Sequence, residues 1–144
     1  MIVVMRLSEA LGLAWSDICV DHIYPHINLV PHPWRQLKTS GSKRLVPLVG
    51  ASLEAIKVMH QQGFSTQFLF PSYTSATKCN GNSASAALNK WLKQYTEQGV
   101  IHSLRHSFRD RLREAEVDLE LTDQLGGWAS SSIGQSYIQR NIFP

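Results

Sequence analysis

The sequence has few cysteines, few charges and no long apolar run. Cys19 and Cys79 are the only two cysteines, and their separation matches no paired spacing. A disulfide framework is therefore not expected, and a reducing compartment is the default. No apolar run reaches the roughly 20 residues that a membrane span requires. The opening Met1–Met5 is too short for a signal peptide and lacks its charged start.

What is present is typical of a globular domain. Apolar residues make up 43% and charged residues 17% of the 144 residues, and this balance argues against disorder. A chain of this length can bury a core and fits one domain. We therefore expect a single domain over residues 1–144.

Cations gather in two stretches of a chain whose net charge is +3. Residues 35–44 hold four cations and no acid, and residues 102–113 hold four arginines and two histidines against one acid. Segregated charge of this kind suits a surface that meets phosphates. Charge alone leaves open the alternative of scattered, solvated cations.

Hydrophobic periodicity predicts an α+β fold that is mostly helical. Proline-interrupted, Ile- and Val-rich residues 18–48 predict a small antiparallel β-sheet of two or three strands near the N-terminus. We expect Ser83 and Asp118 to act as N-caps and Gly126-Gly127 to end a helix. An apolar plug is expected at 68–70. The predicted helices span residues 6–13, 51–62, 83–98, 103–116, 119–125 and 130–139.

Four short stretches carry residues suited to chemistry on phosphates. They are Arg6-Leu7-Ser8-Glu9 before Leu13, Lys38 before Arg44-Leu45-Val46-Pro47-Leu48, His102-Ser103-Leu104-Arg105, and Leu125-Gly126-Gly127-Trp128 with Tyr137 nine residues after the tryptophan. In this order and spacing the chain resembles the catalytic domain of the tyrosine recombinases, the phage-integrase family. The six matches run from Arg6 to Tyr137, which is nearly the whole chain.

The resemblance implies that Arg6 and Arg105 clamp the phosphate. A phosphodiester gains negative charge in the transition state, and fixed cations aimed at its oxygens stabilise that charge. Arginine suits this task because its guanidinium stays charged and offers a fork of donors. Arg105 falls in the first turn of its predicted helix, where unpaired N–H groups would add to an anion site. The alternative for Arg6 is an ion pair with Glu9, which we expect to orient it instead.

By the same resemblance Tyr137 is the nucleophile. A free phenol has a pKa near ~10 and needs a base or a positive surround, and His102 is placed to help move its proton. The resemblance gives Lys38 the role of protonating the leaving 5′-oxygen. Trp128 takes the position of a phosphate-binding His or Trp, with one N–H to donate. Plain core packing is the alternative for Trp128 and Tyr137.

Other polar residues near these motifs are not expected to take part in catalysis. We assign His106 a structural role, such as a buried hydrogen bond. Arg109, Arg111 and Arg113 are interpreted as solvated or DNA-backbone cations. A metal site is not expected, because the spacing of the remaining cysteine and histidines matches no common zinc pattern; these are Cys19, His22, His26 and His32.

The resemblance also implies partners and setting. The expected partner is double-stranded DNA, with no membrane and no cofactor. The expected setting is the cytoplasm, for a bacterial or phage-encoded protein associated with the nucleoid. The family works as a homotetramer on DNA, which leaves both a tetramer and a monomer open here.

The chain also departs from the family pattern. Val3-Val4-Met5 stands where Thr-Gly is usual, and we expect the family's N-terminal DNA-clamping domain to be missing. We therefore expect a truncated chain with weak activity. A type IB topoisomerase and an inert DNA-binding remnant are the alternatives to a recombinase.

Overall fold

The fold is α+β and mostly helical, as predicted. The computed structural model describes residues 4–63 and 65–128, so Tyr137 and the helix expected at 130–139 lie outside the described residues. Five α-helices, three strands and two short 3-10 helices follow one another along the described chain. In order they are α1 (Leu7–Leu11), η2 (Trp15–Asp17), β1 (Ile18–Cys19), β2 (His26–Leu29), η3 (Ser40–Ser42), β3 (Arg44–Pro47), α2 (Ala51–Gln61), α3 (Gly81–Leu92), α4 (Ser103–Glu114) and α5 (Leu119–Gly126).

The predicted sheet is present and has three strands. Its order is β1-β2-β3, and both pairings are antiparallel. Side chains alternate between the faces of a strand, and β3 follows this rule: Arg44 and Val46 are buried while Leu45 and Pro47 are half-buried. Arg44 therefore points to the same side as a core valine.

The core lies between the sheet, α1 and α2. Leu13, Ile27 and Leu29 are at most 2% exposed, and Ile27 is paired with Val46 across the sheet. The predicted apolar plug is confirmed, because the N–H of Leu69 donates to the Leu13 carbonyl at 2.9 Å and its side chain joins this core.

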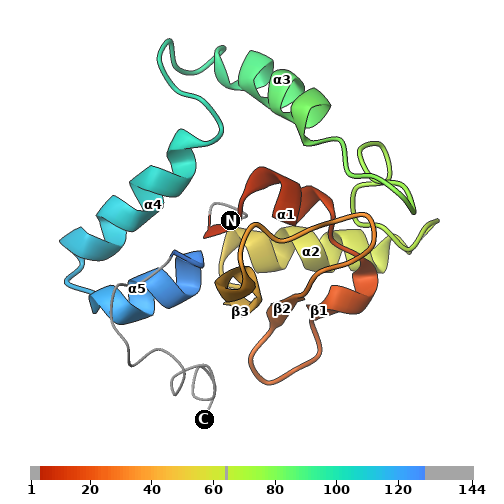
Figure 1. Ribbon diagram of the computed structural model, residues 1–144, viewed down its shortest axis with the longest axis horizontal. Coiled ribbons are helices and arrows are strands. Elements are labelled where there is room, and N and C mark those ends of the chain that lie inside the picture. Colours follow the sequence, from red (N-terminus) through yellow and green to blue (C-terminus); the bar gives the residue numbers. More distant parts are fainter. Residues whose placement is uncertain (1–3, 64, 129–144) are drawn as a thin grey trace.

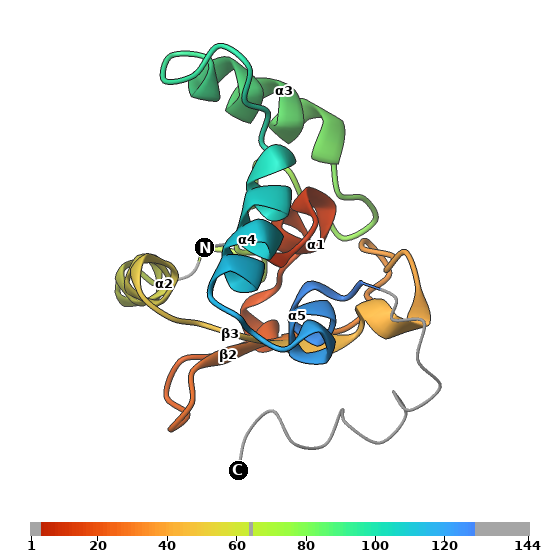
Figure 2. The ribbon, with the colours of Figure 1, turned by 90° about the vertical axis from the view of Figure 1, so that its left-hand side faces the viewer.

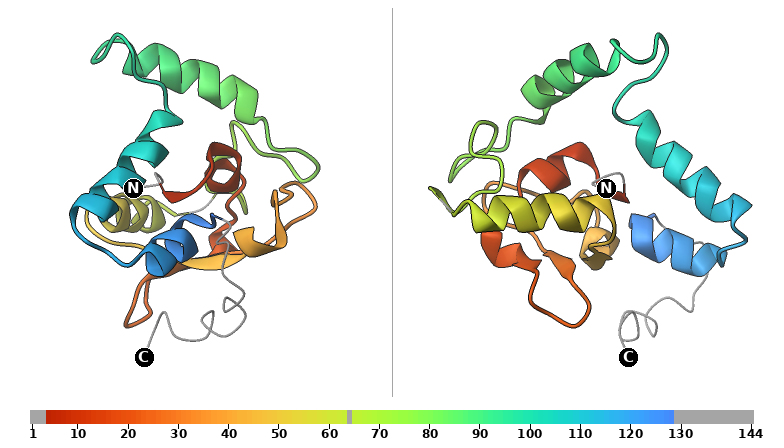
Figure 3. Two further views of the ribbon diagram at one scale, coloured as in Figure 1. Left: turned by 60° about the vertical axis from the view of Figure 1, so that its left-hand side comes forward. Right: turned by 180° about the vertical axis from the view of Figure 1, so that it is seen from behind.

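The C-terminal half of the described chain forms an arch around the core. In Figure 1, α3 and α4 lie at the outer rim around α1, and α5 returns toward β3. Figure 2 and the two views in Figure 3 show the same arrangement from other sides. The arch brings residues near 105 and 126 next to the chain entering α1. Across the described ranges, no helix is both long and apolar enough to cross a bilayer.

The ends of two helices test the predicted caps. Asp118 caps α5 as expected, because its Oδ1 accepts from the N–H of Glu120 at 2.8 Å, and Gly127 ends α5 with φ of 59°. The Ser83 cap was wrong: Asn80 is the N-cap of α3, and its Oδ1 accepts from the Ser83 N–H at 3.2 Å. A side-chain oxygen bonded to the N–H three residues on is the usual geometry of an N-cap.

Two helices bury less than their sequence pattern predicted. α3 ends at Leu92 rather than residue 98, and Trp91 is 52% and Tyr95 70% exposed. In α4, the apolar Leu104 is 39% exposed. The arch spans the rim of the core instead of packing flat against it, so the apolar faces of these helices are only partly covered.

Candidate active site

Arg6 and Glu9 form one unit at the start of α1. Arg6 is the N-cap residue, and its backbone N–H donates to Glu9 Oε2 at 2.9 Å. Its Nη1 donates to Glu9 Oε1 at 2.6 Å and to Ser42 Oγ at 3.1 Å. The Arg6 side chain is 25% exposed and that of Glu9 only 2%. The ion pair is therefore real, but its carboxylate is buried beneath a guanidinium that stays open to solvent.

A second arginine, Arg44, shares that carboxylate. Its Nη2 donates to Glu9 Oε2 at 3.3 Å and to the Val4 carbonyl at 3.2 Å. Its Nη1 donates to the Ser42 carbonyl at 2.8 Å, and its Nε to the Leu125 carbonyl at 2.9 Å. The Arg44 guanidinium thus ties β3, η3, α1 and the end of α5 together.

Sequence reasoning missed Arg44 as a site residue. The signal that could have found it is the alternation of Arg44, Val46 and Leu48, all three of which are buried in the structure. A cation on the apolar side of a strand must have partners, because an unpaired buried charge is costly.

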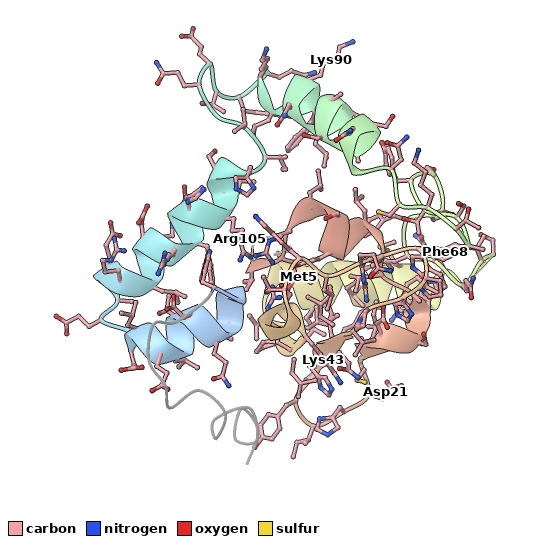
Figure 4. All side chains as sticks on the ribbon, viewed as in Figure 1. Met5, Asp21, Lys43, Phe68, Lys90 and Arg105 are labelled. Atoms are coloured by element: carbon pink, nitrogen blue, oxygen red, sulfur yellow. The ribbon has the colours of Figure 1, made fainter. Side chains whose placement is uncertain are left out.

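Arg105 reaches the same place from α4. It is 5% exposed, and its guanidinium donates to the carbonyls of Val4 and Gly126. Figure 4 shows its side chain directed from α4 toward the segment around Met5. Burial, together with the nearby Arg44 and Arg6 charges, lowers the pKa of Arg105 to about 10. Arg105 therefore remains a cation at neutral pH.

Trp128 lies under two guanidinium groups. The Cζ atom of Arg105 is 4.4 Å and that of Arg109 5.0 Å from its ring centroid, within the range of cation–π attraction. Arg109 also donates to Asp123 Oδ1 at 2.9 Å. Folding thus gives Arg109 a carboxylate and an aromatic face, while its side chain stays 34% exposed; the expected contact with a DNA backbone stays a prediction.

Lys38 is exposed in the loop between β2 and β3, just before η3. The next residue, Thr39, is tied down: its Oγ1 lies 3.0 Å from Ser42 Oγ, and Ser42 Oγ accepts from Arg6. The loop that carries Lys38 is thus hydrogen-bonded to a partner of Arg6.

His102 is exposed at the start of α4, and its ring lies edge-on to that of His106 at 5.1 Å. His106 is itself exposed, so the expected buried hydrogen bond was wrong. The expectation that backbone N–H groups in the first turn of α4 are unpaired was also wrong in part. The Ser103 N–H donates to Val100 at 2.9 Å and the Arg105 N–H to His102 at 3.2 Å, since tight i→i+3 bonds take up such groups at helix ends.

An apolar cavity of about 470 Å³ adjoins these residues between α1, α3 and α4. His102 and Arg105 form the polar part of its wall. The other lining residues are Met5, Leu7, Ala10, Leu11, Phe70, Tyr73, Leu88, Ile101 and Leu104.

The first basic stretch, residues 35–44, does not form one surface. Arg35 is 2% exposed; its Nη2 lies 3.2 Å from Asp17 Oδ2 and its Nη1 donates to the Glu9 carbonyl at 3.2 Å. Arg44 is buried as well, whereas Lys38 and Lys43 are exposed. Of the four cations expected to face phosphates, only the two lysines are exposed. The two arginines are buried and bonded to other parts of the protein.

The fold and this cluster of basic side chains agree with sequence comparison. Residues 1–142 match the Phage integrase family. The chain therefore belongs to this family, which contains the tyrosine recombinases.

Curated relatives point the same way. The chain is 28% identical over 138 residues to "Tyrosine recombinase XerC" of Neisseria gonorrhoeae, covering 92% of this chain and 42% of that protein. It is 29% identical over 138 residues to the XerC of Pelobacter propionicus, with the same two coverages. The chain thus spans about two fifths of the length of the curated relatives that it matches. No solved structure gave a significant match.

Proposed function

We propose that the chain is the catalytic part of a site-specific DNA recombinase or integrase. In this proposal it cuts one DNA strand, holds the 3′-phosphate on Tyr137 and rejoins the strand to a new 5′-hydroxyl. DNA recombination is what family membership implies; the activity of this chain, its DNA partner and the role of each residue are the proposal.

The observation that carries the proposal is that Arg105 reaches the segment that carries Arg6. Ninety-nine residues separate them in the numbering, yet Arg105 donates to the carbonyl of Val4, two residues before Arg6. The Arg6 charge is near enough to help lower the pKa of Arg105, after burial and Arg44. Two such guanidinium groups, one of them 25% exposed, form a site suited to a phosphate. An inert remnant would have no need to hold both cations so close.

The proposed reaction follows from these groups. Tyr137 Oη attacks the phosphorus, a phosphorus–oxygen bond forms to the tyrosine, and the bond to the 5′-oxygen breaks. His102 takes the phenol proton and Lys38 supplies a proton to the leaving 5′-oxygen. Arg6 and Arg105 bind the non-bridging oxygens, and Trp128 supports Arg105 with its ring face. Attack by a 5′-hydroxyl on the phosphotyrosine reverses the steps.

Covalent capture of DNA tests the proposal. The chain is incubated with nicked duplexes drawn from the ends of the genetic element that encodes it, with a metal chelator present, and adducts are separated on a denaturing gel. We expect an adduct from the wild type and none from Tyr137→Phe. Tyr95→Phe is the matched control, because Tyr95 is 70% exposed just after α3; this variant should react like the wild type.

The outcomes separate the alternatives. Equal adducts from the wild type and Tyr137→Phe would refute the nucleophile assignment. If the wild type gives no adduct, the assay is repeated on the chain joined to the part of Neisseria gonorrhoeae XerC that it does not match. A second failure with DNA binding retained would favour a DNA-binding remnant. Relaxation of supercoiled plasmid without strand exchange would favour a topoisomerase.

A further inference from the structure

Arg44 is a buried cation at the centre of the candidate site. Its side chain is only 2% exposed, all three of its guanidinium nitrogens are bonded to protein acceptors, and it does not line the cavity that Arg105 lines, so we do not expect it to contact a DNA phosphate. We infer that Arg44 is a positioning residue that aims Arg6 and Arg105 at one phosphate. This inference rests on the proposed function and adds to it a residue that contacts neither DNA nor the nucleophile.

Arg44 acts on Arg6 through Glu9 and Ser42. One carboxylate oxygen of Glu9 bonds to Arg6 Nη1 at 2.6 Å, and the other is 3.3 Å from Arg44 Nη2. Ser42 is shared in the same way: its carbonyl accepts from Arg44 at 2.8 Å and its hydroxyl from Arg6 at 3.1 Å. Both groups that hold the Arg6 guanidinium are therefore themselves held by Arg44.

Arg44 acts on Arg105 through two stretches of backbone. Both guanidinium groups donate to the Val4 carbonyl, which has two lone pairs to offer. At the end of α5 they donate to neighbouring carbonyls. Arg44 donates to the Leu125 carbonyl at 2.9 Å, and Arg105 donates to the Gly126 carbonyl. The two arginines are thus hydrogen-bonded to the same two backbone segments, the one at Val4 and the end of α5. The position of one guanidinium group therefore constrains the position of the other.

The charges in this cluster leave it ready for an anion. Arg6, Arg44 and Arg105 carry three positive charges against the one carboxylate of Glu9, and Arg44 and Arg6 both lower the pKa of Arg105 through repulsion. If Glu9 had Arg6 as its sole partner, that pair would be neutral toward a ligand. Because Arg44 shares the carboxylate, Arg6 is fixed in direction while the cluster keeps an excess of positive charge.

Arg44→Met and Arg44→Lys test the inference, with Arg35→Met as the matched control. Arg35 is also buried and also donates to backbone carbonyls, but it meets Glu9 through the carbonyl and not the carboxylate. Each variant is assayed for stability in urea, for DNA binding, for the single-turnover rate of adduct formation, and for hydrogen exchange of the Arg6 side-chain N–H groups by ¹⁵N NMR.

We expect Arg44→Met to form adduct about 100-fold more slowly, the size of effect caused by misplacing a reacting group by about 1 Å. Its DNA dissociation constant should stay within about threefold of wild type, because the loss falls on the transition state. Arg6 exchange should rise about tenfold, since its partners are released. Arg44→Lys should react faster than Arg44→Met but more slowly than the wild type, because lysine keeps the charge but lacks the planar set of N–H donors of a guanidinium.

Arg35→Met should lose comparable stability and leave the adduct rate and Arg6 exchange close to wild type. The inference is overturned if both methionine variants slow adduct formation equally, or if Arg6 exchange is unchanged in Arg44→Met. Absence of adduct from the wild type would count against the proposed function alone. The exchange measurement, which needs no DNA, would then decide whether Arg44 positions Arg6.

Discussion

Glu9→Gln removes a negative charge from the most crowded carboxylate near the site while keeping the size of the side chain. Three donors meet this carboxylate: Arg6 Nη1 at 2.6 Å, the Arg6 N–H at 2.9 Å and Arg44 Nη2 at 3.3 Å. A glutamine offers one oxygen instead of two and turns an N–H₂ group toward a guanidinium. At least one donor therefore loses its acceptor.

The expected cost follows from the exposure of the two partners. The pair with Arg6, whose side chain is 25% exposed, contributes no more than about 1 kcal/mol because solvent screens it. Arg44 is 2% exposed, and removing the partner of a buried ion costs about 3–5 kcal/mol. We expect Glu9→Gln to lower the free energy of unfolding by about 3 kcal/mol, since its three carbonyl bonds still support Arg44.

Urea denaturation followed by circular dichroism measures this loss. With a slope of about 2 kcal/mol per molar urea, the midpoint should fall by about 1.5 M. Glu54→Gln is the control, because Glu54 and its partner Lys57 are 71% and 47% exposed at 3.6 Å, and it should cost at most about 0.5 kcal/mol. A loss for Glu9→Gln below about 1 kcal/mol would refute the view that Glu9 is an essential buried counterion.

Three further outcomes test other parts of the structure by the same denaturation assay. Gly63→Ala, at φ 80° with open space around it, should cost about 1 kcal/mol of backbone strain, and Gly127→Ala should cost about 1–3 kcal/mol more because its Cβ would meet a guanidinium at 2.7 Å; equal costs would contradict that contact. Asn80→Ala should cost about 1 kcal/mol and Ser83→Ala almost nothing, and the reverse order would restore the serine cap. Burial lowers the pKa of Arg105 from its usual value to about 10, so the folded state releases this proton before the unfolded state does, and stability rises with pH above about 10. The stability of wild type relative to Arg105→Met should therefore increase above pH 10, by at most about 1.4 kcal/mol per pH unit, and a decrease would contradict the shift.

Much of the fold could be predicted because its signals are local. The α2 helix was expected at 51–62 and spans Ala51–Gln61, and α5 begins after its predicted Asp118 cap. The sheet followed from a proline-broken run of β-branched residues. The α3 cap failed because two polar residues, Asn80 and Ser83, were both suited to it, and the choice depends on where the preceding loop delivers the chain.

The candidate site was harder to predict, because its contacts join residues far apart in sequence. The bond from Arg44 to Leu125 spans 81 residues and that from Arg105 to Val4 spans 101, and no local pattern encodes either. An arginine in a basic stretch also looks the same whether it faces solvent or the core. Arg44 and Arg35 were read as surface charge for that reason, and the roles of Lys38 and His102 stay predictions.

The acceptors that hold Arg44 and Arg105 have a consequence for how this chain can change. Among residues 4–63 and 65–128, the acceptors of these two guanidinium groups other than Glu9 are all main-chain carbonyls; they belong to Val4, Ser42, Leu125 and Gly126. Every amino acid carries such a carbonyl. Substitutions at Val4 and Leu125 can therefore alter the side chain without removing an anchor, as long as the backbone keeps its path. Gly126 and Ser42 are less free, because a Cβ at Gly126 would collide with the Trp128 ring and the Ser42 hydroxyl accepts from Arg6. The geometry of the two arginines thus depends on the backbone path more than on the side chains of Val4 and Leu125.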